Sequence, residues 1–539
     1  MIRILAALLA SCGTALSAAQ KFQVVVYGGT AGGVIAAVSA AREGLKVALL
    51  EPGNHLGGMV SGGLSYTDIG KREVIGGYAL EFYWRVGNHY ETRRYGHDAG
   101  WYHEPHVAEQ VLRAMLDEAR VTVLTGHRLR EKDGVSKSGM RVEEIFTENG
   151  SSFLADVFVD SSYEGDLMAQ AGVSYTWGRE SMAQYGESLA GVRAETPFHQ
   201  FTVDVTPYGD DGRLLPEIQG GPAGEVGAAD RKVQAYNYRM CFSQDPSNQA
   251  IFPKPDGYES SRYSLLARLL KARMDKEGRA SPLRSVIKID PIPNRKADVN
   301  NQGAFSTDYI GGSWEYPDAS YAKRAEIQRA HRNYVAGFLY FLANDAQVPV
   351  ALRQELNQWG LCKDEFTDTG FWPHQLYIRE SRRMVGDFVV TQKDLQTDLL
   401  KPDAIGMGSY NSDSHNIQRI VTPRGFVRNE GDMQVAVTPY QIPYRVMLPK
   451  RSEAHNLLVP VAFSASHVAY SSLRMEPQYM IMGHAAGVAA AMAINGHVPV
   501  QGIETTTLAQ ALKQQGAILE YLPSAQAPIF WQFQRRRAP

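Results

Sequence analysis

A glycine-rich turn near the start of the chain has the residue types that bind a diphosphate group. It follows an apolar run at 22–27 and leads into an apolar helical segment at 34–41. The turn consists of Gly28, Gly29, Thr30, Ala31, Gly32 and Gly33. Glycine permits a tight turn and close packing of helix on strand, and the free N–H groups at a helix N-terminus bind phosphate oxygens. A second apolar run ends at Glu51, whose carboxylate can accept hydrogen bonds from ribose hydroxyls.

This order of strand, glycine turn, helix and strand predicts a dinucleotide-binding Rossmann unit. Thr30 takes the place of the pattern's middle glycine and brings a hydroxyl group to the turn. A second glycine-rich loop, with Gly57, Gly58 and Met59, follows Glu51 directly. With this loop the chain resembles the FAD-dependent oxidoreductases of the glutathione-reductase type, in particular their secreted members, which are often labelled xanthan lyases. The resemblance implies FAD as the cofactor; a Rossmann unit without a ligand is the alternative.

Further segments extend the resemblance over nearly the whole chain. The segment 158–169 is similar to the family's apolar strand and acidic turn, which implies that Asp160 and Asp166 lie at the cofactor. The resemblance also implies that a strand with Val123 passes the adenine, and that a long helix with Gly483 points its N-terminus at the flavin. The alternatives are ordinary turn hydrogen bonds for the aspartates and simple helix packing at Gly483.

Polar residues suited to acid–base chemistry gather in three later segments, 372–384, 409–416 and 467–474. The catalytic candidates are His467, His415, Tyr377, Arg379 and Arg474. Neutral histidine is a suitable general base near pH 7. We place His467 first because its loop is expected to open beside the flavin. A purely structural role for either histidine, and an Arg–Glu network that only holds the domain together, are the alternatives. Weaker candidates for recognising hydroxyl groups are Asp298, Asn300, Asn301, Asp364 and Glu365.

The predicted reaction is transfer of a hydride to FAD from a small polar substrate, such as an alcohol, an amine or a sugar-like molecule. Only one dinucleotide turn is evident, so a separate NAD(P)H domain is not expected, and the electron acceptor stays open. A non-redox carbohydrate lyase or hydrolase is the alternative from another class. That alternative leaves the glycine turn and Glu51 without a use. A flavin-binding protein without catalysis is the third possibility.

Composition excludes several other classes of protein. The 539 residues include 55 Lys and Arg against 57 Asp and Glu. This balance excludes a nucleic-acid binder that works through a general basic field. The three cysteines, Cys12, Cys241 and Cys362, are too few and too scattered for an all-cysteine zinc site or an iron–sulfur cluster. No metal site is predicted, and a disulfide between Cys241 and Cys362 is left open.

The first residues have the layout of an export signal. Residues 1–19 combine one arginine, an apolar stretch and small residues, which predicts a signal peptide and a periplasmic or secreted protein. Cys12 also fits a lipobox, so a lipoprotein anchored through Cys12 is one alternative, and a buried N-terminal strand or helix is another. No later run of 18 apolar residues occurs, so no transmembrane span is expected.

The predicted fold class is α/β. A discontinuous FAD-binding Rossmann domain is expected to comprise 20–171 and 433–500, with an α+β substrate or cap domain at 172–432 inserted into it. A C-terminal helix and tail would follow at 501–539. Within the insertion, helices are expected around 258–276 and 321–342. If 375–383 is a strand, Tyr377 and Arg379 share one of its faces.

Overall fold

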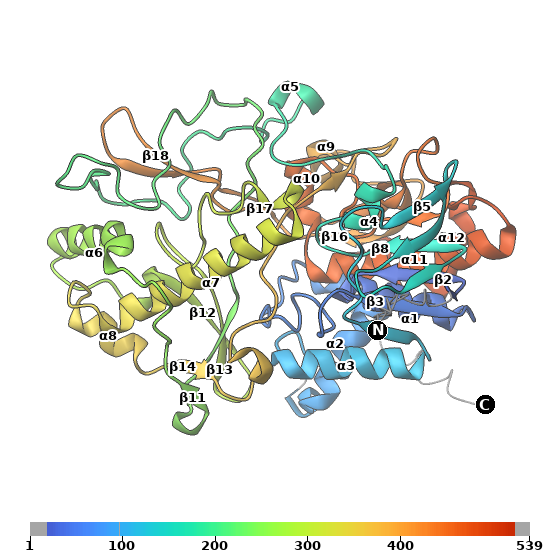
Figure 1. Cartoon of the computed structure of the whole chain (residues 1–539), viewed down its shortest axis with the longest axis horizontal. Coiled ribbons are helices and arrows are strands. Elements are labelled where there is room, and N and C mark those ends of the chain that lie inside the picture. The colour runs from blue at the N-terminus through green and yellow to red at the C-terminus, as the bar shows by residue number, and fades with distance from the viewer. Residues whose placement is uncertain (1–18, 96–97, 523–539) are drawn as a thin grey trace, which may run out of the picture.

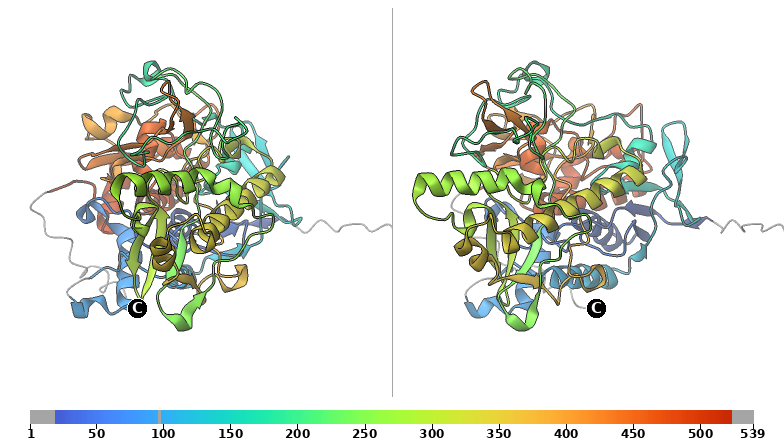
Figure 2. Two further views of the ribbon diagram at one scale, coloured as in Figure 1. Left: turned by 90° about the vertical axis from the view of Figure 1, so that its left-hand side faces the viewer. Right: turned by 60° about the vertical axis from the view of Figure 1, so that its left-hand side comes forward.

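The computed structural model describes residues 19–95 and 98–522. Cys12 and nearly all of the expected signal peptide lie outside the described residues. In Figure 1 the blue N-terminal and red C-terminal segments lie together on one side of the molecule, and the green and yellow middle of the chain forms the other side. Figure 2 shows two further views, in which the green and yellow segments lie in front of the blue and red ones.

A five-stranded parallel sheet forms the centre of the first side. Its strands, in spatial order, are β22 (Leu457–Leu458), β8 (Val157–Asp160), β2 (Val24–Tyr27), β3 (Val47–Glu51) and β4 (Thr122–Thr125). Every neighbouring pair is parallel. The middle strands are continuous apolar runs because helices and loops bury both faces of such a sheet. The predicted α/β fold with a Rossmann-like sheet is thus confirmed, and strand β22 joins the two ends of the chain.

Two helices rich in small residues pack against each other beside this sheet. Helix α1 (Ala31–Arg42) follows the glycine turn, and α11 (Glu476–Gly496) is the long helix expected near the C-terminus. A Cβ atom on Gly483 would collide with the carbonyl oxygen of Gly32. Gly483, expected at the cofactor, therefore lies in the contact between two helices. The packing alternative accounts for this glycine.

A substitution in α11 tests that packing role. We expect Gly483→Ala to destabilise the protein by about 1–3 kcal/mol, because added volume forces two tightly packed helices apart. Gly496→Ala in the same helix is the matched control, since the nearest side-chain atom would lie 3.5 Å from the new Cβ. Thermal unfolding of both variants checks the prediction. Equal melting temperatures would contradict it.

A second, smaller sheet and further helices lie on the same side of the molecule as the parallel sheet (Figure 1). A second sheet runs in the order β1 (Gln20–Lys21), β7 (Ser152–Leu154), β6 (Arg141–Phe146) and β5 (Val135–Ser138). The helices are α2 (Gly77–His89), α3 (Pro105–Glu118), α4 (Asp166–Gln170), α9 (Gln392–Gln396), α10 (His467–Leu473) and α12 (Thr505–Gln514). Strand β16 (Ala404–Gly408) pairs with β21 (Tyr440–Pro443), so this pairing crosses the expected domain boundary at residue 432.

The middle of the chain forms an antiparallel sheet with helices beside it. The strands, in spatial order, are β11 (Gln249–Ala250), β14 (Gly360–Cys362), β10 (Met240–Ser243), β13 (Lys296–Asn301) and β12 (Ile287–Ile292). Its helices are α5 (Met182–Tyr185), α6 (Ser264–Glu277), α7 (Tyr321–Asn344) and α8 (Val350–Leu356). Helices α6 and α7 confirm the two helices predicted there. Two further antiparallel pairs are β17 (Ser412–Ser414) with β20 (Met433–Val435) and β18 (Gln418–Val421) with β19 (Val427–Glu430).

The segment 375–383 is not the continuous strand considered above. Only β15 (Arg383–Met384) is regular, and it pairs with β9 (Tyr175–Thr176). Tyr377 forms a single bridge with Asn237. The buried charged side chains of this segment form hydrogen bonds and ion pairs with several different elements. These side-chain hydrogen bonds and ion pairs fix the position of the segment, a role that strand pairing would otherwise have.

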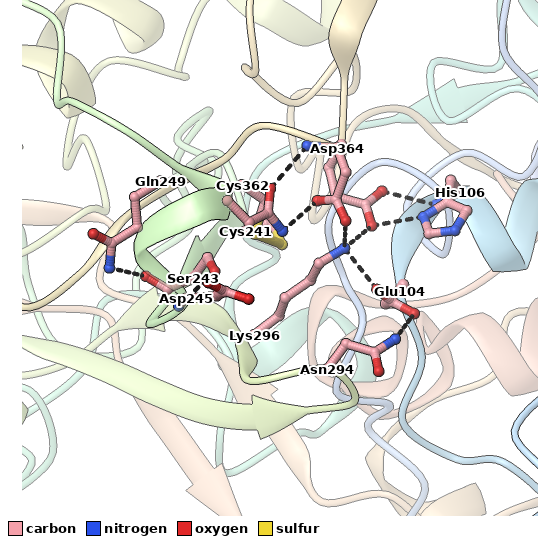
Figure 3. The surroundings of a disulfide bond; sticks show 12 residues. Glu104, His106, Cys241, Ser243, Asp245, Gln249, Asn294, Lys296, Cys362 and Asp364 are labelled. Atoms are coloured by element: carbon pink, nitrogen blue, oxygen red, sulfur yellow. Dashed lines mark hydrogen bonds and ion pairs between the residues drawn. A yellow bond between two sulfur atoms is a disulfide. The ribbon is translucent and has the colours of Figure 1, made fainter.

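A disulfide joins Cys241 and Cys362 across the middle sheet, with Cα atoms 5.7 Å apart (Figure 3). Beside it, the buried Lys296 Nζ lies 2.6 Å from Glu104 Oε1, 2.7 Å from Asp364 Oδ2 and 2.8 Å from Glu365 Oε1. The ammonium group thereby neutralises the acidic groups that gather around it. Asp364 and Glu365, proposed above for hydroxyl recognition, belong to this structural ion cluster.

In the described part of the chain, no helix is both long and apolar enough to cross a membrane.

Candidate functional site

The glycine turn is shaped by backbone atoms that leave no room for side chains. Gly28 has a φ of +96°, and a Cβ there would lie 2.6 Å from the backbone nitrogen of Ser162. A Cβ on Gly33 would collide with the carbonyl oxygen of Gly28. The turn after β8 therefore returns beside the turn after β2, as the sequence predicts.

Thr30 caps helix α1. Its Oγ1 accepts a hydrogen bond from Gly33 N–H at 3.1 Å and donates to the carbonyl oxygen of Ser161 at 2.9 Å. Serine and threonine stabilise helix N-termini in this way. The hydroxyl expected to face the diphosphate instead ties the two turns together.

Glu51 connects the two glycine-rich loops. Its carboxylate accepts hydrogen bonds from Gly29 N–H at 2.7 Å and from Gly53 N–H at 2.6 Å. Burial raises the pKa of Glu51 to about 7, although the two hydrogen bonds act in the opposite direction and lower it. The second loop is held further by a bond from Gly57 N–H to the carbonyl oxygen of Gly29 at 2.7 Å. Val123 pairs with Leu49 on the adjoining strands.

The two aspartates expected at the cofactor have local partners. Asp160 accepts hydrogen bonds from Ser162 N–H, Ser162 Oγ and Met168 N–H, at 3.0, 2.7 and 2.7 Å, and burial raises its pKa to about 6. Asp166 forms ion pairs with Arg324 at 2.8 Å and Arg382 at 2.7 Å. Turn bonds thus account for Asp160, and an ion-pair network accounts for Asp166.

Several buried polar atoms around the two loops and the start of α11 have no hydrogen-bond partner. They are Ser65 Oγ, Thr67 Oγ1, Ser161 Oγ, Glu476 Oε2 and both side-chain amide atoms of Gln478. Buried polar groups are normally satisfied, and leaving one unpaired costs about 1–3 kcal/mol. A dinucleotide with hydroxyl groups, phosphates and ring heteroatoms supplies suitable partners. The residues present therefore fit FAD.

A polar cavity of ≈ 190 Å³ lies where the middle of the chain meets the FAD-binding part. Every residue that lines it has a polar side chain. They are Asp68, His199, Arg239, Lys288, Asn300, Asn301, Gln302, Tyr377, Tyr410, Asn411, Asp413, His415, Gln434 and Arg474. Asp68 follows the second glycine-rich loop, and Arg474 precedes α11. The cavity thus adjoins the second glycine-rich loop and the helix whose N-terminus the resemblance points at the flavin.

His415 is held in this cavity by a buried carboxylate. Its Nδ1 lies 2.6 Å from Asp308 Oδ2. Burial opposes ionisation of Asp308, but Arg379 and His415 outweigh it and lower the pKa of this carboxyl. A carboxylate at Nδ1 selects the tautomer with the proton on that nitrogen, which leaves Nε2 free to accept another. The arrangement suits a general base.

A second histidine lies parallel to the first. The rings of His199 and His415 have centroids 6.1 Å apart and an interplanar angle of 13°. His199 Nδ1 accepts a hydrogen bond from Gly303 N–H at 3.1 Å. Burial, followed by the charge of His415, lowers the pKa of His199 to about 4. His199 is therefore neutral near pH 7.

Three arginine side chains form hydrogen bonds or ion pairs with other residues in or behind the cavity lining. Arg474 donates to Tyr377 Oη at 2.9 Å, which brings two of the predicted catalytic residues together. Arg239 forms a buried ion pair with Asp298 at 2.5 Å. Arg379 lies behind the cavity, where its Nη1 is 3.1 Å from Asp308 Oδ1. Asp298 and Arg379 do not line the cavity themselves, and they influence it through Arg239 and Asp308.

The structure places His467 away from the cavity. His467 is the first residue of α10, capped by Ser466, and the open loop expected there is absent. Its Nδ1 lies 2.8 Å from Glu380 Oε2. Burial opposes ionisation of Glu380, yet His467 and Arg383 lower the pKa of this carboxyl to about 2. His467 thus belongs to a buried network of charged side chains, in line with the structural alternative given above. His415 therefore becomes the first candidate for the general base.

Several residues of the site escaped sequence reasoning. Asp308, His199, Arg239 and Asp68 stand in no recognisable motif, and the pairing of Asp308 with His415 spans 107 positions. Asn300 and Asn301 were weaker candidates, and both line the cavity. One signal was readable: Ser466, a favoured N-cap residue, stands before an apolar segment and indicates a helix at His467.

Comparison with solved structures gives distant similarities. A geranylgeranyl bacteriochlorophyll reductase-like protein from Thermoplasma acidophilum is 12% identical over 92% of this chain and 88% of its own, with a TM-score of 0.35. NikD, an amino acid oxidase essential for nikkomycin biosynthesis, is 13% identical over 30% of this chain, with a TM-score of 0.22. A flavin-containing monooxygenase from Stenotrophomonas maltophilia is 18% identical over 30% of this chain and 43% of its own, with a TM-score of 0.19. The similarity to NikD spans 57% of the NikD chain.

No curated protein matches the chain. The family model of FAD-dependent oxidoreductases, in contrast, matches residues 23–512. This match includes both glycine-rich loops, the polar cavity and helix α11. The chain therefore belongs to the FAD-dependent oxidoreductase family and is an enzyme of that class with FAD as its cofactor.

Proposed function

We propose that this enzyme is exported and oxidises a small, polyhydroxylated, sugar-like substrate. The observation that carries the proposal is the wholly polar cavity with His415 in its wall. Ligand pockets are usually larger, about 300–1,000 Å³, and mostly apolar. A cavity of ≈ 190 Å³ whose lining residues all have polar side chains suits a small molecule with a hydroxyl group on most of its carbons.

The cavity offers groups that both donate and accept hydrogen bonds. Five side-chain amides line it, those of Asn300, Asn301, Gln302, Asn411 and Gln434. Each amide pairs with a hydroxyl group in either direction. Asp68 and Asp413 provide further acceptors, and Arg239, Lys288 and Arg474 provide donors. Because charges of both signs are present, a neutral or singly charged sugar fits this wall.

His415 supplies the base for such an oxidation. Its Nε2 accepts the proton of the reacting hydroxyl group, while Asp308 stabilises the resulting imidazolium. Bound FAD supplies the acceptor for the hydride that leaves the same carbon. Tyr377 and Arg474, joined by a hydrogen bond, line the same cavity and orient the substrate there.

The proposed domain arrangement is of the glutathione-reductase type. The parallel sheet with strands from both ends of the chain supports a discontinuous FAD domain. The separate antiparallel sheet between residues 240 and 362 supports an inserted substrate domain. The disulfide between Cys241 and Cys362 is consistent with an oxidising compartment outside the cytosol.

The absorbance spectrum of the purified protein is the first test. We expect flavin bands that are released as FAD on denaturation, and loss of the oxidised flavin band when a sugar is added without oxygen. The panel should contain aldoses, alditols, uronic acids, simple alcohols and amines. Reduction by simple amines or alcohols but by no sugar would contradict the proposed substrate class.

A further inference from the structure

Helix α11 begins with a buried carboxyl group that has no positively charged partner. Glu476 is 3% exposed. Its Oε1 accepts a hydrogen bond from Tyr163 Oη at 2.7 Å, and its Oε2 has no partner. Among the described residues, none forms an ion pair with this carboxyl. An isolated buried carboxylate is strongly disfavoured, so the group is expected to hold its proton.

The titratable groups that face Glu476 carry no charge near neutral pH. They are the phenols of Tyr163, of Tyr83 on α2, and of Tyr479 on α11. Burial raises the pKa of each phenol above its ordinary value. Burial likewise raises the pKa of Glu476 to about 8, against the hydrogen bond from Tyr163.

A second buried polar side chain with no partner follows two residues later, in the first turn of α11. Gln478 is fully buried, and neither its amide oxygen nor its amide nitrogen has a partner. Tyr163, which donates to Glu476, accepts a hydrogen bond from Met59 N–H at 2.9 Å. A Cβ on Gly32 would lie 2.9 Å from the carbonyl oxygen of Tyr479. Glu476 is thus linked through Tyr163 to the second glycine-rich loop, and the backbone of the first turn of α11 packs against the first.

We propose that Glu476 tunes the flavin: as a neutral carboxylic acid, together with the Gln478 amide, it bonds to bound FAD and stabilises the negative charge that reduction adds. A helix N-terminus favours the same charge. The proposal goes beyond the proposed function because it involves no substrate. Two electrons and one proton enter FAD on reduction. Where Glu476 is ionised beforehand, it takes up a second proton from water in the same event.

The midpoint potential of bound FAD, measured against pH, tests this role. Between pH 7 and about 8 reduction takes up one proton, because Glu476 is protonated in both states. Above that pH, Glu476 takes up a second proton on reduction, and the slope of potential against pH doubles. We expect this break in the wild-type enzyme. We expect a single slope in Glu476→Gln, whose amide does not titrate. Dithionite titration with dyes of known potential gives the values.

Two further variants separate Glu476 from other groups. Tyr163→Phe removes the hydrogen bond that lowers the pKa of Glu476, so the break should move to higher pH. Asp432→Asn is the matched control. Asp432 is also fully buried with both oxygens unpaired, and burial raises its pKa to about 8. Asp432 lies in the loop between β19 and β20, where its titratable neighbours are Asp413 and Asp308 and not the groups around Glu476, so the break should persist in this variant.

Three outcomes would overturn the proposal. One is a single slope in the wild-type enzyme, and another is a break that persists in Glu476→Gln. The third is a break lost in Asp432→Asn, which would assign it to the other acid. If Glu476→Gln fails to retain FAD, Tyr163→Phe still decides, because an unmoved break in that variant excludes Glu476.

Discussion

Replacing His415 with alanine should slow the reduction of bound FAD by substrate by about 10²–10⁴-fold, the usual contribution of a general base. His415 lines the polar cavity, and Asp308 fixes its Nδ1 at 2.6 Å. Without an acceptor at Nε2, the hydroxyl proton must leave to water while the hydride is transferred. Anaerobic stopped-flow absorbance, with a sugar identified by the bleaching screen, measures this rate. The FAD content of the variant should equal that of the wild-type enzyme.

His467→Ala is the informative comparison, because the two histidines have similar partners. Each has its Nδ1 against a buried carboxylate, Asp308 for His415 and Glu380 for His467. They differ in position, since only His415 lines the cavity. Slow reduction in His467→Ala with normal rates in His415→Ala would assign the base to His467. Asp308→Asn should slow the reaction as well, because it removes the charge that stabilises the imidazolium.

The shape of the glycine turn was predictable because its determinants are local. Gly28 and Gly33 are required by the path of the backbone itself, and the apolar runs on either side report a buried parallel sheet. Glu51 was found in the same way, at the end of its strand. The sequence identified this part of the fold because the order of strand, turn, helix and strand is continuous along the chain.

The substrate site was predictable only in part because it is assembled from distant segments. Tyr377, His415 and Arg474 were found as polar residues within dense clusters, and the structure brings these three to one cavity. Arg379 came from the same cluster as Tyr377 but lies behind Asp308. Its position depends on the irregular backbone of this segment, which the alternation of a strand does not describe. Asp308 itself had no local signal. Its role follows from packing against a residue 107 positions away.

The same difference between local and distant determinants explains why the surroundings of His467 could not be predicted. Its neighbours in sequence resemble those of a reactive loop, and its histidine ring has the right chemistry. The controlling interactions are distant, because Glu180 accepts the hydrogen bond of the His467 backbone N–H at 2.9 Å and Glu380 binds its ring. These bonds place His467 in a buried charge network with Arg383.

Replacing Gly33 with alanine should weaken the binding of FAD by about 5- to 140-fold. The added methyl group would collide with the carbonyl oxygen of Gly28 and would lie 2.9 Å from Ser161 Cβ. Both neighbours belong to the two turns that meet beside the start of helix α1, so the helix has to move away from β2. Overpacking of this kind costs about 1–3 kcal/mol, and each 1.4 kcal/mol lost from binding weakens affinity about tenfold. The ratio of flavin to protein absorbance after gel filtration measures the loss.

Gly44→Ala separates this collision from ordinary backbone strain. Gly44 ends the turn after α1 with a φ of +88°, and no atom lies within 4 Å of the position of its Cβ. Alanine there strains the backbone without displacing the helix, so the variant should be less stable and still retain FAD. If Gly33→Ala binds FAD as well as Gly44→Ala does, close contact of helix and strand is not what shapes the site. The diphosphate would then depend on the N–H groups of α1 alone.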